Sequence, residues 1–396
     1  MMEVMVKRCA GIDVHKKTIT VCTLVGSLNR SKPKKQTKEF DTTTRELQAC
    51  AQWLESLDIT TVLMESTGQY WRPVWNILEP YGFKMILANA QHIKQVPGRK
   101  TDMRDAQWIA ELGRCGLVSG SYVPERDIQD LRQLTRHRSS VKEDLTRRKN
   151  QVHDILQRSN IKLSSYLSDI FGATGQRLLS LFINGEVINE QLIEETISKR
   201  VHASPRQLFE AMNGSLTTIN RQLLQLELAT IRRLTDEIKE CEQLIEEHLQ
   251  PYEDLYLRLL EISGISQTTA QVVIAEVGPT VEAFETVERL ASWAGLCPGS
   301  YESAGIQYGS KTTRGNRYLK AALCRAGLTA GRSNHQEFRA IYFKFSERKQ
   351  KGKGVVALAH KLLRIVYMLI KTGETYTPWQ QKKDSSYGNS IGVPKN

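Results

Sequence analysis

The first 120 residues alternate between short apolar runs and amphipathic stretches. Apolar runs of strand length on either side of the polar HKK triplet predict a hairpin, and the stretches between the later runs have helical periodicity. The expected elements are strands at 9–14, 18–25 and 38–43, a helix at 43–57, a strand at 60–66, a helix at 70–82 and a strand at 83–90. This order predicts a ribonuclease-H-like α/β fold, in which an antiparallel meander continues into parallel strands through helical crossovers.

The middle of the chain has the pattern of two long helices. Apolar positions in steps of three and four run from Ile128 to Ile155 and place Arg138 and Arg148 at core-type positions. A second seam of the same kind covers 231–245. The two seams predict either an antiparallel helix pair or an oligomeric coiled coil.

The last third begins with two apolar helical stretches in 259–279 that meet at a turn formed by Ser263 and Gly264. This pattern is typical of a helix-hairpin-helix, whose turn amides can bind a phosphate, although Ser266 stands where a second glycine is usual. A glycine-rich, basic stretch at 296–323 follows, and helices are expected after it.

The chain is long enough for two or three domains, with 396 residues of which 40% are apolar. We expect an α/β fold joined to an all-α part, in four segments. These are a ribonuclease-H-like domain at 1–125, a coiled-coil helical region at 126–253 with an inserted segment at 160–215 that has no recognisable motif, a C-terminal domain at 254–375, and a disordered tail at 376–396.

Charge and composition narrow the class of protein. A formal net charge of +12 favours polyanionic partners such as DNA or RNA, with a ribosome-associated or simply soluble basic protein as the alternative. No apolar run is long enough to span a membrane and the N-terminus lacks a secretory signal, which predicts a cytoplasmic protein without membrane contact. The seven scattered cysteines, without CxxC or zinc-type spacing, are expected to be reduced thiols.

Four carboxylates fall at the ends of predicted elements. Asp13 ends the first strand, and Glu65 ends the fourth strand, which is expected beside it. Asp102 and Asp105 lie three residues apart at the start of a predicted helix, so they share one of its faces. Taken singly, each is also explained as an ordinary carboxylate at a strand end or a helix N-terminus.

Together, the four carboxylates predict a metal site. Carboxylates that lie close together repel one another unless cations neutralise them, and oxygen ligands favour Mg²⁺ or Mn²⁺ over zinc. Two such ions about 4 Å apart can activate the attacking oxygen and stabilise the leaving one in phosphodiester displacement.

Ser303 lies in the small-residue stretch PGSYESAG, where Gly305 allows an unusual turn. A serine hydroxyl in such a loop can attack phosphorus and form a phosphoserine, although a serine that only shapes the turn is the commoner occurrence. Four basic residues that could contact phosphates follow: Lys311, Arg314, Arg317 and Lys320.

Six short blocks of the sequence are similar, in order and separation, to those of one known family. They are GIDVHK, MESTGQYW, GRKTDMRDA, ISGI followed by TA, LASWAGLCPGSYESAG and TTRGNRYLKAAL. Over most of its length the chain thus resembles the DEDD-type insertion-sequence transposases of the IS110 family, which are recombinases directed by a structured noncoding bridge RNA.

The resemblance implies that the four carboxylates are the metal-binding DEDD tetrad of a RuvC-like domain and that Ser303 is the nucleophile of a C-terminal transposase domain. Ser300 and Ser310 are nearby competitors, and Ala304 between Ser303 and Gly305 departs from the commoner Ser-Gly pair. It further implies a homo-oligomer, a dimer or tetramer, in which the tetrad of one protomer faces the serine of another. Element-end DNA, target DNA and a bridge RNA are the implied partners, with sequence chosen by base pairing.

A basic helix in the middle region is a candidate contact for RNA or DNA. Its cations are Arg132, Arg136, Arg138, Lys142, Arg147, Arg148 and Lys149, and Gly264 is the candidate phosphate contact of the hairpin turn. A solvated coiled-coil face explains each of these cations equally well.

These observations predict a DNA transposase that cuts and rejoins DNA through a phosphoserine at Ser303, with Mg²⁺ at the tetrad and without ATP. The main alternative is a RuvC-like Holliday-junction resolvase or nuclease that uses water as its nucleophile and leaves Ser303 structural. A noncatalytic nucleic-acid-binding protein is a further alternative. An actin-like ATPase is disfavoured because GIDVHKKT supplies no glycine-rich phosphate loop.

Overall fold

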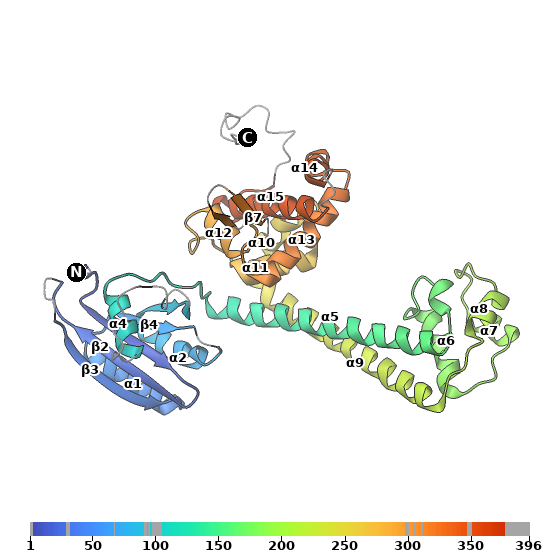
Figure 1. Cartoon of the computed structure of the whole chain (residues 1–396), viewed down its shortest axis with the longest axis horizontal. Coiled ribbons are helices and arrows are strands. Elements are labelled where there is room, and N and C mark those ends of the chain that lie inside the picture. Colours follow the sequence, from blue (N-terminus) through green and yellow to red (C-terminus); the bar gives the residue numbers. More distant parts are fainter. Residues whose placement is uncertain are drawn as a thin grey trace. The chain divides into compact units, whose positions relative to one another are not determined.

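A computed structural model describes most of the chain and divides it into two compact units, Met1–Pro124 and Glu125–Asn396 (Figure 1). The described residues are 3–28, 32–66, 68–90, 93, 96, 105–297, 301–303, 306–309, 312–346 and 351–376. The predicted tail at 376–396 therefore lies, except for its first residue, outside the described residues.

The first unit is built on a mixed sheet. Its strands in the described part are β1 (Arg8–Val14), β2 (Thr18–Val25), β3 (Lys34–Asp41), β4 (Thr61–Glu65) and β5 (Lys84–Ala88). They lie in the order β3-β2-β1-β4-β5, with β1, β2 and β3 antiparallel and with β4 parallel to both β1 and β5. The predicted order of strands and helices in this mixed α/β unit is confirmed, although β3 begins earlier than expected, at Lys34.

Helices cover both faces of this sheet. On one face, α1 (Thr44–Ser56) and α2 (Trp71–Leu78) pack on the apolar side chains that β1, β2 and β4 direct toward them. α2 ends in a short 3-10 segment, η1 (Glu79–Tyr81), after which Gly82 adopts a left-handed conformation.

The other face is covered by α4 (Asp105–Arg114), which lies very close to β1. A Cβ atom on Gly11 would be 2.2 Å from the backbone nitrogen of Ala110 and 2.4 Å from the carbonyl oxygen of Ala106. Only glycine leaves room for the helix backbone here. Gly11 thus sets how closely the start of α4 approaches the end of β1.

The second unit begins with a long helical hairpin and ends in a compact helical body. The hairpin is α5 (Arg126–Arg158) and α9 (Thr218–Leu249), and it carries η2 (Leu163–Ser165), α6 (Ala173–Asn184), α7 (Glu190–Thr196) and α8 (Pro205–Met212) at its turn. The body contains η3 (Gln250–Tyr252), α10 (Glu253–Leu260), α11 (Gln267–Val277), α12 (Val287–Trp293), β6 (Tyr301–Ser303), β7 (Ile306–Gly309), α13 (Arg317–Arg332), α14 (Gln336–Ser346) and α15 (Lys351–Thr372).

The two long helices pack antiparallel, as the ion pairs between them show. Lys142 of α5 pairs with Glu242 of α9, and further along α5 Arg148 pairs with the earlier Glu227. Val141 at the predicted seam is buried between them. An oligomeric coiled coil remains a prediction.

Two simpler expectations can be compared with the structure. All seven cysteines are free, in agreement with the prediction of unpaired thiols. Among the residues that the structure describes, no helix is both long enough and apolar enough to cross a membrane.

Candidate active site

Two of the predicted carboxylates lie level with each other on neighbouring strands. β1 and β4 are parallel, with Ile12 opposite Met64, so continuing this register by one residue brings Asp13 level with Glu65. Because side chains alternate between the faces of a sheet, both carboxylates share the face of Gly11, which α4 covers. The strand ends thus gather the two acids, as the sequence predicted.

Asp105 adds a third carboxylate, because it is the first residue of α4. The pKa of the Asp13 carboxyl is raised, first by burial and further by the negative charges of Asp105 and Glu65. Like charges that act on one another in this way are close in space. Asp102, the fourth predicted acid, lies outside the described residues.

His15 acts in the opposite direction on Asp13. Its Nε2 atom is 3.3 Å from Oδ2 of Asp13, and the imidazole lowers the pKa of that carboxyl. The backbone nitrogen of His15 donates to the carbonyl of Thr18, so the hairpin turn holds the ring beside the end of β1. The sequence predicts only a hairpin turn at the HKK triplet, and the position of His15 two residues after Asp13 is the signal for a contact.

A cleft of about 640 Å³ opens beside Asp13 and Asp105. Strands β2 and β3 form its other wall, since Thr20 lies opposite Asp13 and Glu39 lies opposite Thr20 in the pairing of β1, β2 and β3. Its described lining is Asp13, Thr20, Thr37, Lys38, Glu39, Asp105 and Ala106. The β2 and β3 residues of this wall are not evident from the sequence, because their position depends on the register of the hairpin.

The donor chemistry of this region fits a hard divalent cation. Asp13, Glu65 and Asp105 offer only carboxylate oxygens, the ligands that Mg²⁺ and Mn²⁺ prefer. Within the described ranges, no three His, Cys, Asp or Glu side chains are arranged closely enough to form a metal site by themselves. The three acids therefore supply the ligand type, and a complete ligand set remains a prediction.

The predicted nucleophile lies in a short hairpin of the second unit. Ser303 ends β6 and pairs with Ile306 at the start of β7. The structure describes the backbone of this residue, while its side chain and the residues Ser300, Ser310 and Lys311 lie outside the description.

The two chain segments that flank this hairpin are joined at its base. The nitrogen of Thr313 donates to the carbonyl of Cys297, at 3.1 Å, and the nitrogen of Asn316 donates to the carbonyl of Trp293, at 2.9 Å. Between these two hydrogen bonds the backbones of Gly295 and Gly315 are in contact. A Cβ on Gly315 would be 2.3 Å from the backbone nitrogen of Gly295. The base is therefore fixed by backbone contacts that leave no room for side chains.

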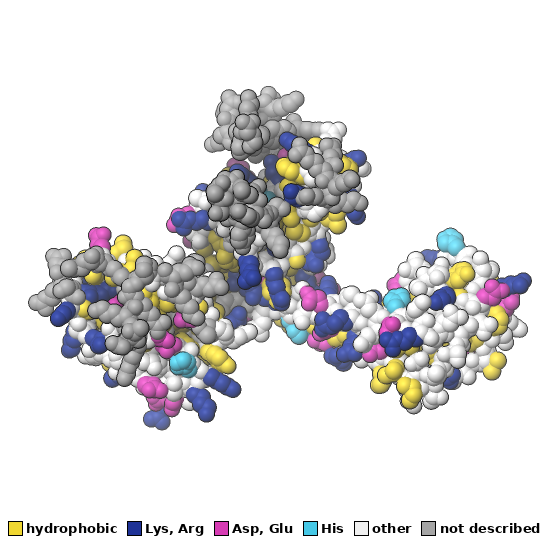
Figure 2. All heavy atoms as spheres, in the orientation of Figure 1, with side chains coloured by type: hydrophobic (Ala, Val, Ile, Leu, Met, Phe, Trp, Pro, Cys, Tyr) yellow, Lys and Arg dark blue, Asp and Glu magenta, His cyan; other side chains and the backbone are white. Residues whose placement is uncertain are grey.

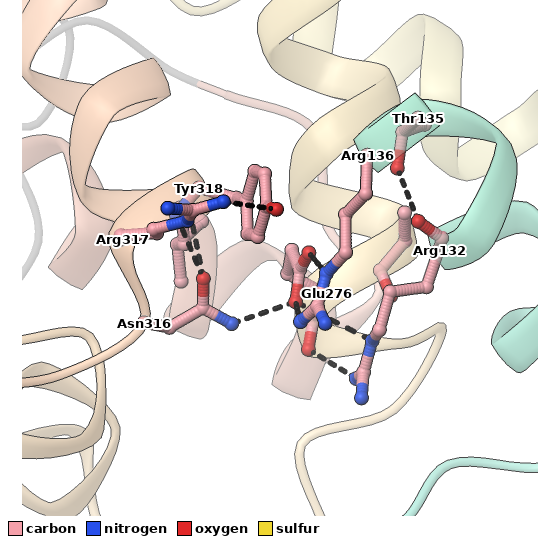
Figure 3. A network of polar contacts seen from close by, with 9 residues as sticks. Arg132, Thr135, Arg136, Glu276, Asn316, Arg317 and Tyr318 are labelled. Atoms are coloured by element: carbon pink, nitrogen blue, oxygen red, sulfur yellow. Dashed lines mark hydrogen bonds and ion pairs between the residues drawn. The ribbon is translucent and has the colours of Figure 1, made fainter. Parts of the chain in front are cut away.

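A fully buried carboxylate, Glu276, connects this base to α5 (Figure 3). Arg136 donates to its two oxygens at 2.7 and 2.8 Å, and Nε of Arg132 is 3.3 Å from Oε2. The amide of Asn316 donates to the same oxygen at 2.6 Å, while its own oxygen accepts from the backbone at the start of α13. Three segments that are far apart in sequence, α5, α11 and the start of α13, thus meet at one charge.

Several cations of the basic helix have partners inside the protein. Arg138 is 2% exposed and donates to Gln271, so its guanidinium is not available to a nucleic acid in this structure. Arg132 and Arg136 are bound to Glu276. Three other cations of this basic helix are in ion pairs nearer the surface: Lys142–Glu242, Arg147–Asp144 and Arg148–Glu227. For these three cations, contact with a nucleic acid remains a prediction.

Gly264 is held by packing against α13. Its φ is +94°, and a Cβ would be 2.5 Å from the Cβ of Ala330, so both conformation and space require glycine. Two helices and a tight connection are present, as predicted, and a phosphate contact there remains a prediction. Arg314 and Arg317 are exposed before and at the start of α13, and Lys320 donates to Thr312.

Comparison with known families gives the class of the protein. A DEDD-type IS110 family model described as a transposase matches residues 10–161, which include Asp13, Glu65 and Asp105. A second model, described as Transposase IS116/IS110/IS902 family, matches residues 256–343, which include the Ser303 hairpin. The two models match in the order expected for one enzyme. The chain is therefore a DNA transposase.

Individual relatives agree with this class. The chain is 26% identical over 332 residues to the transposase for insertion sequence element IS1111A of Coxiella burnetii, covering 81% of this chain and 80% of that protein. It is 28% identical over 190 residues to the putative transposase y4pF/y4sB of Sinorhizobium fredii, covering 46% of each. The uncharacterized 42 kDa protein of insertion element IS900 of Mycobacterium paratuberculosis is 22% identical over 325 residues, covering 74% of this chain and 80% of the other. The chain belongs to the IS110 family of DEDD transposases.

Proposed function

We propose that this transposase cuts and rejoins DNA with two sets of residues, an acidic set that holds Mg²⁺ or Mn²⁺ and a serine that forms a covalent phosphoserine. The acidic set is Asp13, Glu65, Asp102 and Asp105, and the serine is Ser303. The observation that best supports the proposal is the level placement of Asp13 and Glu65, with Asp105 close enough to raise the pKa of Asp13. Gathering like charges costs free energy, and such arrangements concentrate at functional sites.

The residues around Asp13 would prepare it to hold a cation. Asp13 binds a cation as the carboxylate, and His15 opposes the rise of its pKa, which favours that form. A divalent ion, when bound, would supply positive charge against the negative charge that develops at the phosphate. The threonines of the neighbouring cleft wall, Thr20 and Thr37, offer hydroxyl groups that can hydrogen-bond a DNA phosphate.

Ser303 would carry the strand during exchange. The Oγ–phosphorus bond forms while the phosphorus–oxygen bond to the released DNA strand breaks. The serine proton passes to water, and the released strand oxygen takes up a proton. Rejoining reverses these changes at the new strand, so the phosphodiester bond energy is retained and ATP is not consumed.

Guidance by a noncoding bridge RNA and action as a dimer or tetramer complete the proposal. The net charge of +12 and the exposed Arg314 and Arg317 support contact with polyanions. A protein guided in this way contacts the backbone and shape of the nucleic acid, whereas base pairing reads the sequence.

The experiment is a cleavage assay on element-end DNA with the cognate noncoding RNA and Mg²⁺, in which a protein–DNA adduct is trapped on a denaturing gel. Wild type and Ser300→Ala are expected to form the adduct, and Ser303→Ala is expected to form none. If Ser303→Ala cuts DNA normally without an adduct, the enzyme uses water as its nucleophile. If instead Ser300→Ala alone loses the adduct, the nucleophile is Ser300.

A further inference from the structure

The position of Ser303 depends on the base of its hairpin. Ser303 and Ile306 form the last residue pair of β6 and β7, whereas Thr313 and Cys297 close the base at the opposite end. A rotation of the base therefore moves the serine further than it moves the base itself. Whatever sets the direction of the base also sets where the serine lies.

Asn316 joins this base to the rest of the second unit. Its backbone nitrogen donates to the carbonyl of Trp293, which lies in the other flanking segment. Its side-chain oxygen accepts from the backbone nitrogens of Tyr318 and Leu319 and so caps α13. Its side-chain nitrogen donates to Oε2 of Glu276 at 2.6 Å. One residue thus connects the hairpin base, the start of α13 and a buried carboxylate.

Glu276 is a fixed point for this connection. Figure 2 shows Asp and Glu side chains at the surface of the molecule, where water solvates them, whereas the side chain of Glu276 is 0% exposed. Arg136 holds both of its oxygens. Arg132 donates to the backbone carbonyls of Ala275 and Glu276, at 2.9 and 2.8 Å. Helix α5 therefore holds the backbone of Glu276 as well as its side chain.

A buried network of this kind is better suited to fixing a direction than to adding stability. Replacing a buried ion pair by apolar residues of similar volume is often neutral or stabilising. Hydrogen bonds, in contrast, are directional and prefer donor–hydrogen–acceptor angles above about 150°. A fully satisfied buried network accordingly specifies one arrangement of the groups that it joins.

We propose that Asn316 is a positioning residue for Ser303, acting through its hydrogen bond to Glu276. The inference rests on the proposed function of Ser303 as the nucleophile. Attack on phosphorus requires the serine oxygen to be close to the phosphate and in line with the bond that breaks, and a misplacement of about 1 Å can cost about 100-fold in rate. Asn316 itself makes no contact with the reacting atoms in this proposal; it fixes the direction of the hairpin that carries the serine.

The test uses the full-length protein with element-end DNA, the cognate noncoding RNA and Mg²⁺. It measures DNA affinity and, separately, the rate of adduct formation in a single turnover at saturating DNA. Asn316→Ser and Asn316→Asp both keep an oxygen that can cap α13 and lose the donor to Glu276. Both are expected to form the adduct about 10- to 100-fold more slowly. Their DNA affinity is expected to change by less than about twofold, because only the reacting geometry is altered.

A matched control separates positioning from a general loss of stability. Thr217 caps α9 by accepting from the backbone nitrogen of Asn220, at 3.2 Å, and has no connection to the hairpin base. Thr217→Ala removes this helix cap from the same unit and is expected to form the adduct at the wild-type rate. All rates are compared at a temperature at which circular dichroism shows each variant to be folded.

Four outcomes would overturn the proposal. Wild-type adduct rates in Asn316→Ser and Asn316→Asp would leave Asn316 as a helix cap alone. An equal loss of rate in Thr217→Ala would mean a general effect of stability. A loss of DNA affinity as large as the loss of rate would make this region a DNA contact. If wild type cuts DNA without an adduct, and Ser303→Ala cuts equally well, the proposed function itself fails and the positioning role fails with it.

Discussion

The two units of this transposase each contain a carboxylate in a crowded position, and they hold these charges in opposite ways. Glu276 in the second unit is fully buried, and its oxygens meet Arg132, Arg136 and Asn316. The side chain of Asp13 in the first unit is 22% exposed. Asp105 and Glu65 add negative charge around it, and His15 opposes them.

The two surroundings have opposite effects on the free energy of the ionised carboxylate. A buried ion is tolerated when the fold supplies opposite charges and hydrogen bonds, as it does around Glu276. The fold instead places further acids beside Asp13, which raises the free energy of the ionised site. Ionisable groups whose charged form is disfavoured in this way concentrate at functional sites, so the arrangement favours a role in binding or catalysis.

The largest expected effect is on activity, in Asp13→Asn. We expect DNA cleavage to fall by about 10⁴-fold or more, the scale seen when one member of a catalytic unit is removed. Glu39→Gln, which changes a carboxylate of the same cleft, is the matched control and is expected to retain most of the activity. Strand cleavage under single-turnover conditions measures both variants. Asp13→Asn with near-normal cleavage would remove this acid from the catalytic set.

Although Asp13→Asn is expected to lose activity, it is expected to keep or gain stability. The pKa of Asp13 in the folded protein is raised above its ordinary value of 3.8, so folding favours the protonated form. Its stabilising contribution is present below pH 3.8 and is lost as the pH rises through the folded pKa. At neutral pH the charge is a cost, and asparagine removes it. Without added metal, Asp13→Asn should therefore unfold at the same temperature as wild type or a higher one.

Glu276→Gln is expected to have the second largest effect, on stability rather than chemistry. Removing one partner of a buried ion pair leaves Arg132 and Arg136 uncompensated and should lower the free energy of unfolding by about 3–5 kcal/mol. Denaturant unfolding followed by circular dichroism measures the change. Glu285→Gln breaks an exposed pair with Arg289, at 3.0 Å, and is expected to cost less than about 1 kcal/mol. Equal losses in both variants would contradict a structural role specific to Glu276.

The neighbouring positions of the acids in the first unit were predictable from the sequence for a physical reason. Strands and helices have local periodicities, and Asp13 and Glu65 each follow a recognisable apolar run. In the predicted topology the two strands are parallel neighbours, so their ends coincide. Local pattern and topology together were enough to bring the acids close.

The partners of the arginines in α5 were not predictable in the same way. Arg132, Arg136 and Arg138 form part of a cationic helix, a pattern equally typical of a nucleic-acid contact and of a solvated face. Their partners Gln271 and Glu276 are more than 130 residues away, so no local pattern joins them. Within the apolar stretch of α11, Glu276 was the available signal, since an acid there needs a cation.

The smallest expected effect tests the outermost member of the Glu276 network. Asn316→Ser keeps an oxygen that can cap α13 but loses the amide that donates to Glu276, whereas Asn316→Ala loses both. We expect serine to cost about 1.5 kcal/mol, the value of a hydrogen bond to a charged group, and alanine about 1 kcal/mol more for the lost cap. Denaturant unfolding of both variants measures these costs. In a Glu276→Gln background the cost of Asn316→Ser should shrink, because the charge that received the bond is gone. If that cost stays the same, Asn316 acts only as a cap, and the base of the Ser303 hairpin is not tied to α5 through Glu276.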